Sequence, residues 1–579
     1  MTISAAHWHR TATEAARQRD WAAVLHILEM HRTEWPEEPA FLLNAAHWLR
    51  MAGHGDRANE ALLRAAALED SFGIAEEARI LEITPGRPPP SPHPATILLD
   101  IQDLLQFLHE TGNISGIQRV QLGILAAVLQ GRAGLHGADC IAVFPTLAHG
   151  ALFAPRPEDM QALLAYCTGT RRDVALARPL VERLRSAALR LTPQAGAAFL
   201  VLGAHWFFAG APGFYAGLRA QGVRLGVLIY DMFPASHPEY TTADTTAFFN
   251  QSLNEGLFFW DFAFAISEYS ARAFRRIAAQ RGYPPIETRA IPLAHSFGLE
   301  RPPRPGWLSD WPAALGDLEG RDYILAVSTI EARKNHQLLF HAWARMIEEG
   351  DNPPPLVLVG RPGWRVGDLI GQLDATRYLN GRILIVHGLS DAALEALYRG
   401  CLFTVMPSFA EGWGLAVGES LSFGRPCIAA NTTALPEVGG DLVTYADPLD
   451  VPAWIAAIRL WLRDRTALAA MQARIGREFI PRQWPDVARH LLGETAQLQA
   501  LPPARPRRPA PRCGWNWAGS APSASPLPAR AAMPRPQGSP YPRRYRWQAV
   551  GTPRRPAAPG CAAASRSCWS KPTPRPAAP

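Results

Sequence analysis

Two series of short apolar runs, separated by segments of helix length, constrain the fold of this chain of 579 residues most strongly. Runs of this length suit buried strands, and they are too short for core helices. Strands that alternate with helix-length segments are typical of parallel sheets covered by helices. The first series comprises 96–100, 140–144, 198–202, 223–229 and 262–266, and the second comprises 323–327, 356–359, 383–386, 402–406 and 426–430.

The two series predict an α/β protein with two Rossmann-like, doubly wound domains. A link rich in Pro and Trp at 302–312 separates the series, so we expect a first domain at 96–304 and a second at 305–500. Ligands of open α/β sheets bind outside the carboxyl ends of the strands. A cleft between facing strand ends is therefore the predicted binding site.

The first 85 residues form a separate region of amphipathic helices with a period near 34 residues. This period resembles a pair of tetratricopeptide-type helical hairpins, in which small residues let helices approach. A generic helical cap is the alternative. A cluster of Pro and Gly predicts a linker at 86–95. The corresponding positions are Trp8 with Leu42, Ala12 with Ala46, and Pro36 with Asp70.

The basic charge of the chain is concentrated in its last segment, residues 501–579. This segment holds fourteen of the 58 Lys and Arg residues and no acid, which leaves 44 basic against 51 acidic residues elsewhere. The body therefore carries no general basic charge that would indicate a nucleic-acid partner. The Pro, Arg, Ala and Ser composition predicts a disordered tail. Binding to an anionic surface and translation of a shifted reading frame are alternative explanations of it.

The cysteines and the N-terminus indicate a cytoplasmic protein. Seven single cysteines lack the paired spacing of a zinc site or a disulfide framework. The first ten residues lack the basic-then-apolar order of an export signal. The uncharged stretch 191–218 contains His205 and Pro212, and we interpret it as a strand and a loop rather than a membrane span.

The stretch 407–426 carries the most specific chemical signal, two glutamates eight residues apart. The apolar run 402–406 predicts a strand, Glu411 then falls in a loop, and Glu419 falls on the following helix. Backbone N–H groups of the loop and the helix N-terminus suit a phosphate. Carboxylates beside such a site can accept hydrogen bonds from sugar and ribose hydroxyls.

These residues resemble the E-x7-E signature of retaining nucleotide-sugar glycosyltransferases, specifically glycosyltransferase family 4, whose fold is GT-B. The resemblance covers about residues 96–495. The sequences of its motifs are similar to those of bacterial surface-polysaccharide mannosyltransferases. The matching positions are Ser408, 411–415, Glu419, Gly424, Pro426, 434–438, Gly440 and Asp441.

The resemblance implies donor-side roles in the second domain. Glu411 would lie near the hydroxyls and anomeric carbon of the donor sugar, and Glu419 would hold the nucleotide ribose. Arg333 and Lys334 follow the run 323–327 and resemble the Arg-Lys element of the family. These cations would stabilise the departing diphosphate without a metal ion. The amides of Gly412, Trp413, Gly414 and Leu415 would bind the diphosphate.

In the first domain, the segment 111–120 resembles the family's first loop. Gly116 would let the backbone approach the donor, and Arg119 would face the cleft on the acceptor side. Ordinary helix capping by the Ser-Gly pair is an equal alternative. Ser267 and Glu268 also resemble a family element, which we interpret as a helix cap near the cleft.

Asp231 and His205 are the other candidates of the first domain. Asp231 lies in a loop similar to the family's His-Asp-x-x-Pro element, although Tyr230 stands where His is often found. Asp231 could orient a hydroxyl of the acceptor or of the sugar, or it could simply form a turn. His205 could line the acceptor pocket, or it could be a core histidine beside Trp206.

The sequence therefore predicts a cytoplasmic, metal-independent, retaining glycosyltransferase that uses no cofactor. It would transfer a hexose, with mannose suggested, from a nucleotide-sugar donor to a growing glycan of a surface polysaccharide. A lipid-linked glycan acceptor would bring peripheral contact with the inner membrane face, and residues 1–85 could bind a protein partner. The alternatives are a GT-B nucleotide-sugar epimerase or phosphorylase, and a non-catalytic binding protein that uses the helical repeats.

Overall fold

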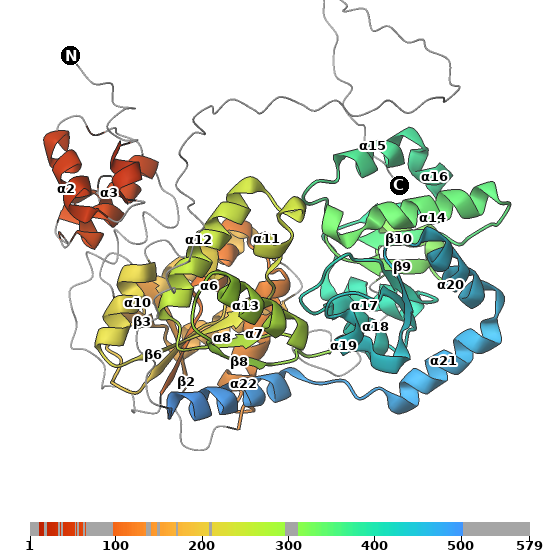
Figure 1. Ribbon diagram of the computed structural model, residues 1–579. Coiled ribbons are helices and arrows are strands. Elements are labelled where there is room, and N and C mark those ends of the chain that lie inside the picture. The colour runs from red at the N-terminus through yellow and green to blue at the C-terminus, as the bar shows by residue number, and fades with distance from the viewer. Residues whose placement is uncertain are drawn as a thin grey trace, which may run out of the picture. The chain divides into compact units, whose positions relative to one another are not determined.

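The computed structural model describes most of the chain between residues 96 and 501 and parts of the N-terminal region (Figure 1). The predicted linker 86–95, most of the link 302–312 and the predicted tail beyond Leu501 lie outside the described residues. The described residues are 11–16, 20–32, 35, 39–52, 54, 57–58, 60–61, 64, 96–134, 140–146, 151–169, 172–207, 211–295 and 311–501.

Two helices of the N-terminal region, α2 (Trp21–Met30) and α3 (Pro39–Met51), pack against each other. Asp20 caps α2, because its carboxylate accepts a hydrogen bond from the Ala23 N–H at 3.0 Å. Ala12 and Ala46, two of the predicted small positions, are buried in the core of this region. Leu42 is buried there as well, but its predicted counterpart Trp8 and the predicted pair Pro36 and Asp70 lie outside the described residues, so the repeat stays a prediction.

The first sheet has eight strands in the order β4-β3-β2-β1-β5-β6-β7-β8. Six neighbouring strands, β2 to β8 in that order, are parallel, whereas β3 and β4 pair antiparallel at one edge. All five predicted runs of this half form strands, and β3, β4 and β8 were not predicted. The bounds are β1 Ile97–Asp100, β2 Cys140–Thr146, β3 Ala151–Ala154, β4 Leu189–Leu191, β5 Ala198–Val201, β6 Arg224–Ile229, β7 Phe262–Ala265 and β8 Glu287–Ala290.

Helices connect most of the parallel strands of the first sheet, and their apolar sides fill its core. The uncharged stretch 191–218 contains β5 and the start of α10, as the interpretation without a membrane span required. None of the helices within the described ranges has both the length and the apolar composition needed to cross a bilayer. The bounds are α6 Gln102–Thr111, α7 Gly116–Leu129, α8 Pro157–Thr168, α9 Val174–Ser186, α10 Ala211–Ala220, α11 Phe233–Ser236, α12 Ala243–Phe259 and α13 Glu268–Gln280.

The second sheet has six parallel strands in the order β11-β10-β9-β12-β13-β14. This is the order of a Rossmann fold, and it reverses direction between β9 and β12. The five predicted runs form β9 to β13, and β14 was not predicted. The strand bounds are β9 Ile324–Val327, β10 Leu356–Val359, β11 Ile383–Val386, β12 Thr404–Met406, β13 Cys427–Ala430 and β14 Thr444–Ala446.

The helices of the second half follow its strands, except for the last helix. That helix, α22, packs against α7 and β1 of the first sheet, although chain order had grouped it with the second domain. Its Trp484 ring lies on Gly123, where a Cβ atom would come within 2.2 Å of the ring. The bounds are α14 His336–Glu348, α15 Gly367–Ala375, α16 Arg377–Gly381, α17 Asp391–Gly400, α18 Leu415–Ser422, α19 Leu435–Gly439, α20 Val451–Arg463, α21 Arg465–Glu478 and α22 Trp484–Gln499.

The predicted fold class is confirmed by these two sheets. The described chain contains two Rossmann-like halves, which together make the GT-B architecture. A helical N-terminal region precedes them. The site residues follow β9 and β12 of the second half. In doubly wound sheets, ligands bind where the strand order reverses. The fold therefore directs attention to the carboxyl ends of these two neighbouring strands.

Candidate functional site

The loops that follow β9 and β12 lie against each other at the reversal point of the second sheet. Asn335 joins them, because its side-chain amide donates hydrogen bonds to the carbonyls of Pro407 at 3.1 Å and Pro448 at 2.9 Å. The Phe409 N–H also donates to the Arg333 carbonyl at 2.9 Å. Asn335 has a left-handed backbone with φ of 56°, a conformation that Asn tolerates. These bonds fix the two loops in one arrangement.

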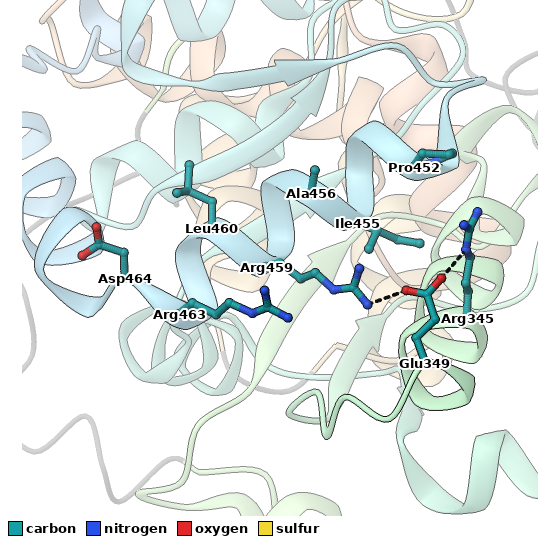
Figure 2. A pocket seen from close by; sticks show the side chains of 9 residues that line it. All are labelled: Arg345, Glu349, Pro452, Ile455, Ala456, Arg459, Leu460, Arg463 and Asp464. Atoms are coloured by element: carbon teal, nitrogen blue, oxygen red, sulfur yellow. Dashed lines mark hydrogen bonds and ion pairs between the residues drawn. The ribbon is translucent and has the colours of Figure 1, made fainter.

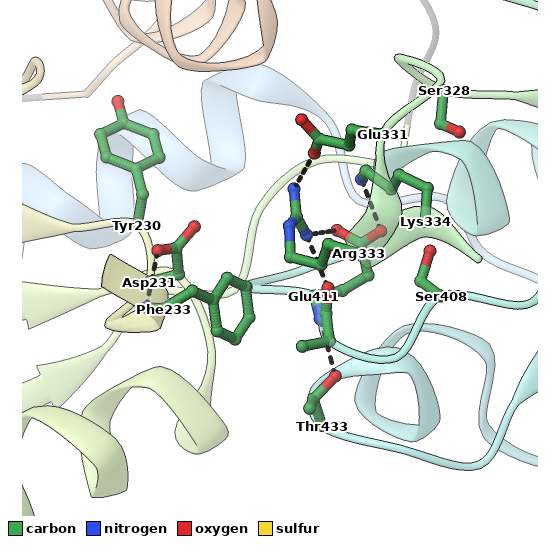
Figure 3. Close-up of polar contacts among 12 residues, drawn as sticks. Tyr230, Asp231, Phe233, Ser328, Glu331, Arg333, Lys334, Ser408, Glu411 and Thr433 are labelled. Atoms are coloured by element: carbon green, nitrogen blue, oxygen red, sulfur yellow. Dashed lines mark hydrogen bonds and ion pairs between the residues drawn. The ribbon is translucent and has the colours of Figure 1, made fainter. Parts of the chain in front are cut away.

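Glu411 lies at the centre of this arrangement and is 5% exposed. The Lys334 Nζ donates to its Oε1 at 2.5 Å, and the Arg333 guanidinium donates to its Oε2 at 3.0 Å (Figure 3). The Glu411 N–H donates to the Thr433 hydroxyl at 2.9 Å. The structure thus brings together Arg333, Lys334 and Glu411, three residues that the sequence predicted as one site.

The electrostatics of this group favour an ionised carboxylate. Burial raises the pKa of Glu411, but the charges of Lys334 and Arg333 and their hydrogen bonds outweigh it and hold this pKa at about 2. Burial and the neighbouring Arg333 lower the pKa of Lys334, against the effect of Glu411. The pKa of Arg333 is raised, because nearby carboxylates outweigh its burial. Two cations therefore face one carboxylate in a nearly dry site.

Arg333 has further partners that hold its guanidinium. It donates to Glu331 at 2.8 Å and to the Ala410 carbonyl at 2.5 Å. Its Cζ atom also lies 5.1 Å from the centre of the Phe233 ring, a distance that suits a cation–π interaction. Since Phe233 belongs to α11, the first half contributes one wall to the cationic site.

Asp231 lies beside this cluster at the end of β6. Its carboxylate accepts a hydrogen bond from the Phe233 N–H at 3.1 Å, which is the geometry of the predicted turn (Figure 3). Burial raises the pKa of Asp231, and Arg333 lowers it. The neighbouring Tyr230 hydroxyl donates to the Leu202 carbonyl at 2.7 Å. Tyr230, which stands where the family often has His, is thus held by a hydrogen bond within the first half.

Gly412 and its neighbours hold the loop against the first half. A Cβ atom at Gly412 would lie 2.2 Å from the Tyr230 carbonyl oxygen, so only glycine fits there. The Trp413 side chain is buried and stacks on His295 with ring centres 5.8 Å apart. Gly414 has φ of 106° and precedes α18, which begins at Leu415.

Glu419 lies on α18 and is as deeply buried as Glu411. The Tyr398 hydroxyl donates to its Oε2 at 2.7 Å, and Arg119 donates to its Oε1 at 3.2 Å. Burial raises the pKa of Glu419, and Arg119 and Tyr398 oppose this rise. Arg119 therefore lies beside a predicted donor-side residue, whereas the sequence had assigned it to the acceptor side.

Gly116 is the first residue of α7, and no atom lies within 4 Å of the position of a Cβ. The Ser115 N–H before it donates to Gln118 Oε1 at 3.3 Å, as in a capping box. Capping is thus present, and the space in front of Gly116 also suits the predicted approach of a ligand.

His205 is a core histidine, which was one of the two predicted alternatives. Its ring contacts Trp206, Phe249 and Trp260, and its Nδ1 lies 2.9 Å from the Ser252 hydroxyl. Burial lowers its pKa to about 3. The geometry gives no support to an acceptor-side role for His205, because aromatic rings enclose it.

Sequence reasoning missed two carboxylates near the site. Asp103 accepts hydrogen bonds from Gln118 at 2.8 Å and Gln121 at 2.6 Å, and so anchors the first turns of α7. Glu437 accepts from the Glu268 and Tyr269 N–H groups, both at 2.7 Å, at the start of α13. Glu437 stands in the matched segment 434–438, which was the available signal, whereas Asp103 had none.

The predicted cap at the start of α13 is present, because Ser267 accepts a hydrogen bond from the Ser270 N–H at 3.0 Å. The Ser270 hydroxyl in turn donates to the carbonyls of Tyr230 at 3.1 Å and Gly412 at 3.4 Å. The first turn of α13 therefore supports the contact between the two halves.

A surface groove between α14 and α20 has a volume of about 470 Å³ but lies apart from this chemistry (Figure 2). Its arginines are paired: Arg345 with Glu349 at 2.8 Å, and Arg459 with Glu349 at 2.7 Å. Paired charges leave little attraction for an anionic ligand, and we assign no site to it. Within the described ranges, no group of three or more His, Cys, Asp and Glu side chains could hold a metal ion.

This chain is similar in sequence to known glycosyltransferases. A family model described as glycosyl transferases group 1 matches residues 309–479. The O-antigen chain mannosyltransferase B of Escherichia coli is 32% identical over 256 residues, which are 44% of this chain and 64% of that protein. The MMP alpha-(1->4)-mannosyltransferase of Mycolicibacterium hassiacum is 32% identical over 145 residues, 24% of this chain and 34% of that protein.

The similarity is partial in each case. The chain covers less than two thirds of the length of these two curated relatives. Among solved structures, HepE of Anabaena in complex with UDP-glucose aligns with a TM-score of 0.45 and 15% identity, over 69% of this chain and 99% of that one. The second half, with β9, β12 and their loops, is the part that the family model matches.

Proposed function

We propose that this protein is a glycosyltransferase that transfers a hexose from a nucleotide-sugar donor to a growing glycan. The relatives named as mannosyltransferases indicate that this hexose is mannose. The observation that carries the proposal is the convergence of Arg333 and Lys334 on Glu411 where the strand order of the second sheet reverses. The family model over 309–479 and the relatives named as mannosyltransferases support the same reaction class. Synthesis of a surface polysaccharide fits the relative named for O-antigen chains.

The two cations would bind the diphosphate of the donor. Negative charge builds on the diphosphate as the bond to the anomeric carbon breaks, and a buried guanidinium and ammonium stabilise that charge. Arg333 can hold two phosphate oxygens with its planar fork, and Lys334 adds a point charge. Glu331, Ala410 and Phe233 already fix the Arg333 side chain. Little reorganisation is then needed when the diphosphate arrives.

The carboxylates would bind hydroxyl groups. Glu411 lies next to both cations, so a donor held by them would bring its sugar ring to this carboxylate. Glu419, further along α18, would take the ribose. The N–H groups from Gly412 to Leu415 at the start of α18 would contact the phosphates, with the positive end of the helix dipole behind them.

We propose a retaining reaction without a protein nucleophile, and the charge state of Glu411 supports the absence of a nucleophile. A carboxylate with a pKa of about 2 is a weak base and a poor nucleophile. We therefore propose same-face departure and attack, in which the leaving phosphate accepts the proton of the acceptor hydroxyl. Asp231, with its raised pKa, would orient that hydroxyl or one of the sugar. Arg333 and Lys334 would supply the positive charge that a metal ion supplies in other enzymes, so we expect metal-independent transfer. We propose the cytoplasm as its location.

The test is a panel of nucleotide sugars that includes GDP-mannose, UDP-glucose and ADP-glucose. We expect release of nucleoside diphosphate from one donor, faster with a mannose-containing glycan acceptor, with transfer of the sugar to that glycan. Lys334→Ala should lose most of this turnover, whereas Arg345→Ala, a change at a surface ion pair, should keep it. Production of an epimerised nucleotide sugar, or of a sugar phosphate from inorganic phosphate, would support the alternative enzymes and refute the proposal.

A further inference from the structure

An ion-pair cluster connects α7 of the first half to α17 and α18 of the second. Arg119 lies 3.2 Å from Glu419 and 3.6 Å from Asp391, and Arg172 lies 3.0 Å from Asp391. The Glu419 and Arg172 side chains are 6% and 9% exposed, so water screens the cluster only partly. Arg119 is not part of the E-x7-E motif, and it stands 300 positions away from Glu419 in the chain.

Both oxygens of Glu419 are engaged, one by each neighbouring element. Arg119 of α7 donates to Oε1, and Tyr398 of α17 donates to Oε2 at 2.7 Å. Each carboxylate oxygen keeps a second lone pair, so the two hydroxyls of a ribose could still donate to the same group. The two donors therefore fix the orientation of the carboxylate without filling its capacity.

The charge of Glu419 depends on the same contacts. Burial raises its pKa, Arg119 and Tyr398 lower it, and Asp391 raises it. A protonated carboxyl would carry its own O–H and would accept fewer hydrogen bonds from ribose. Of the ion pairs within the described ranges, the one that reaches Glu419 comes from Arg119.

We propose that Arg119 is a positioning residue for donor binding, which holds the Glu419 carboxylate in the orientation in which it accepts both ribose hydroxyls. Arg119 acts through Glu419 and is itself held by Asp391, which Arg172 also contacts. The proposal rests on the proposed function, because it requires a nucleotide donor. It moves Arg119 from the acceptor side to the donor side, and it makes ribose recognition depend on contact between the two halves.

The experiment separates the ribose from the phosphates. GDP, UDP and ADP are titrated calorimetrically into the wild-type protein, and the one that binds is compared with its 2′,3′-dideoxy analogue. We expect the wild type to prefer the ribose form by about tenfold or more, as for a hydrogen bond to a charged group. In Arg119→Ala and in Glu419→Gln this preference should fall toward one, and the double variant should lose no more than either single variant.

Two further readouts distinguish positioning from general support of the structure. Arg119→Lys, which keeps a positive charge, should recover part of the ribose preference. The acid limb of nucleotide affinity should move to higher pH in Arg119→Ala, because the pKa of Glu419 rises further when its cation is removed. Arg183→Ala, which removes an ion pair to Asp159 within the first half, is the matched control and should change neither readout.

The outcomes are distinct. If Arg119→Ala keeps the wild-type ribose preference, or weakens both nucleotides equally, Arg119 does not act through Glu419 and the inference is overturned. If it is overturned while Lys334→Ala still weakens nucleotide binding, the proposed function survives. If the wild-type protein binds none of the three nucleotides, the proposed function fails and this inference fails with it.

Discussion

The surroundings of Glu411 and Glu419 differ, although both carboxylates are buried and the two residues stand only eight positions apart. Glu411 contacts two cations of its own half, Arg333 and Lys334, and its pKa falls to about 2. Among the described residues, the cation that contacts Glu419 is Arg119 of the other half, and burial keeps the pKa of Glu419 raised. Equal burial thus produces opposite charge behaviour, because the number and origin of the neighbouring cations differ.

This difference separates two kinds of site. The group around Glu411 is held together by the loops after β9 and β12 of the second half, and the first half adds the Phe233 ring beside Arg333. The group around Glu419 is complete only when α7 of the first half is in place. We therefore expect phosphate recognition to depend mainly on the second half and ribose recognition to depend on both halves.

The largest expected effect follows from replacing each glutamate by glutamine. Glu411→Gln leaves two buried cations without their carboxylate and removes the acceptor next to the sugar. We expect its kcat to fall roughly 100-fold or more, as for other groups that stabilise a transition state. Glu419→Gln should mainly raise the KM for the donor, by about tenfold. Steady-state kinetics on the active donor measure both values.

Circular dichroism of both variants checks that the fold persists. Equal losses of kcat in the two variants would break the comparison, since they would place both carboxylates next to the reacting atoms.

The second effect concerns the contact between the halves at Gly412. In Gly412→Ala the added Cβ would meet the Tyr230 carbonyl oxygen at 2.2 Å, so the loop and the first half must move apart. We expect a loss of kcat/KM of about tenfold or more, because displacements of this size disturb positioning. The ribose preference should suffer more than phosphate affinity, because Glu419 depends on the other half. Nucleotide titration measures both.

Gly476→Ala is the matched control. Gly476 lies within α21 and has no atom within 4 Å of a Cβ position, so alanine should leave activity unchanged and stabilise the helix slightly. If Gly412→Ala behaves like this control, the halves do not need to be in close contact for function.

Much of the second half could be predicted from the sequence. Its strands β9 to β13 are uninterrupted apolar runs, and the residues of the Glu411 group lie in the short loops that follow two of them. Neighbouring parallel strands bring such loops to one edge of the sheet, so Arg333 and Lys334 could be placed beside Glu411. Strand β14 was not predicted, because it has only three residues and two of them are half-buried.

The first half was less predictable for physical reasons. Strand β8 carries Glu, Thr and Arg at a sheet edge and shows no apolar run. The antiparallel strands β3 and β4 are short, with four and three residues. The pairing of Arg119 with Glu419 joins residues 300 positions apart, and the packing of α22 on α7 joins residues 484–499 to the first sheet. Such contacts depend on tertiary packing, which no local pattern encodes.

The third effect is opposite pH dependence at the two glutamates. Glu411 has a folded pKa below its ordinary 4.5, so its contribution to stability is present above that value and is lost as pH falls toward 2. Glu419 has a raised folded pKa, so its contribution is present below 4.5 and is lost as pH rises through the folded pKa. Urea unfolding midpoints between about pH 3 and pH 8 measure both slopes.

Glu411→Gln should flatten the acid side of this profile, and Glu419→Gln should flatten the side above 4.5. The same change of slope in both variants would contradict the assigned charge states.

The smallest effect is expected at the surface groove. Arg345→Ala removes a hydrogen bond to Glu349, an exposed carboxylate that keeps a second partner in Arg459. Surface ion pairs contribute little, so we expect a melting temperature within about 2 °C of the wild type and unchanged turnover. Differential scanning fluorimetry and the donor assay check this. A large loss of activity would show that the groove takes part in function.

The measurement that tests the central claim most directly is the affinity of nucleoside diphosphate for Lys334→Ala, compared with the wild type. GDP, UDP and ADP are titrated calorimetrically into both proteins at low and moderate salt. If the buried ammonium beside Glu411 binds the diphosphate, the nucleotide that binds the wild type should lose roughly tenfold to 100-fold in affinity in the variant. Equal affinity for both proteins would contradict the account.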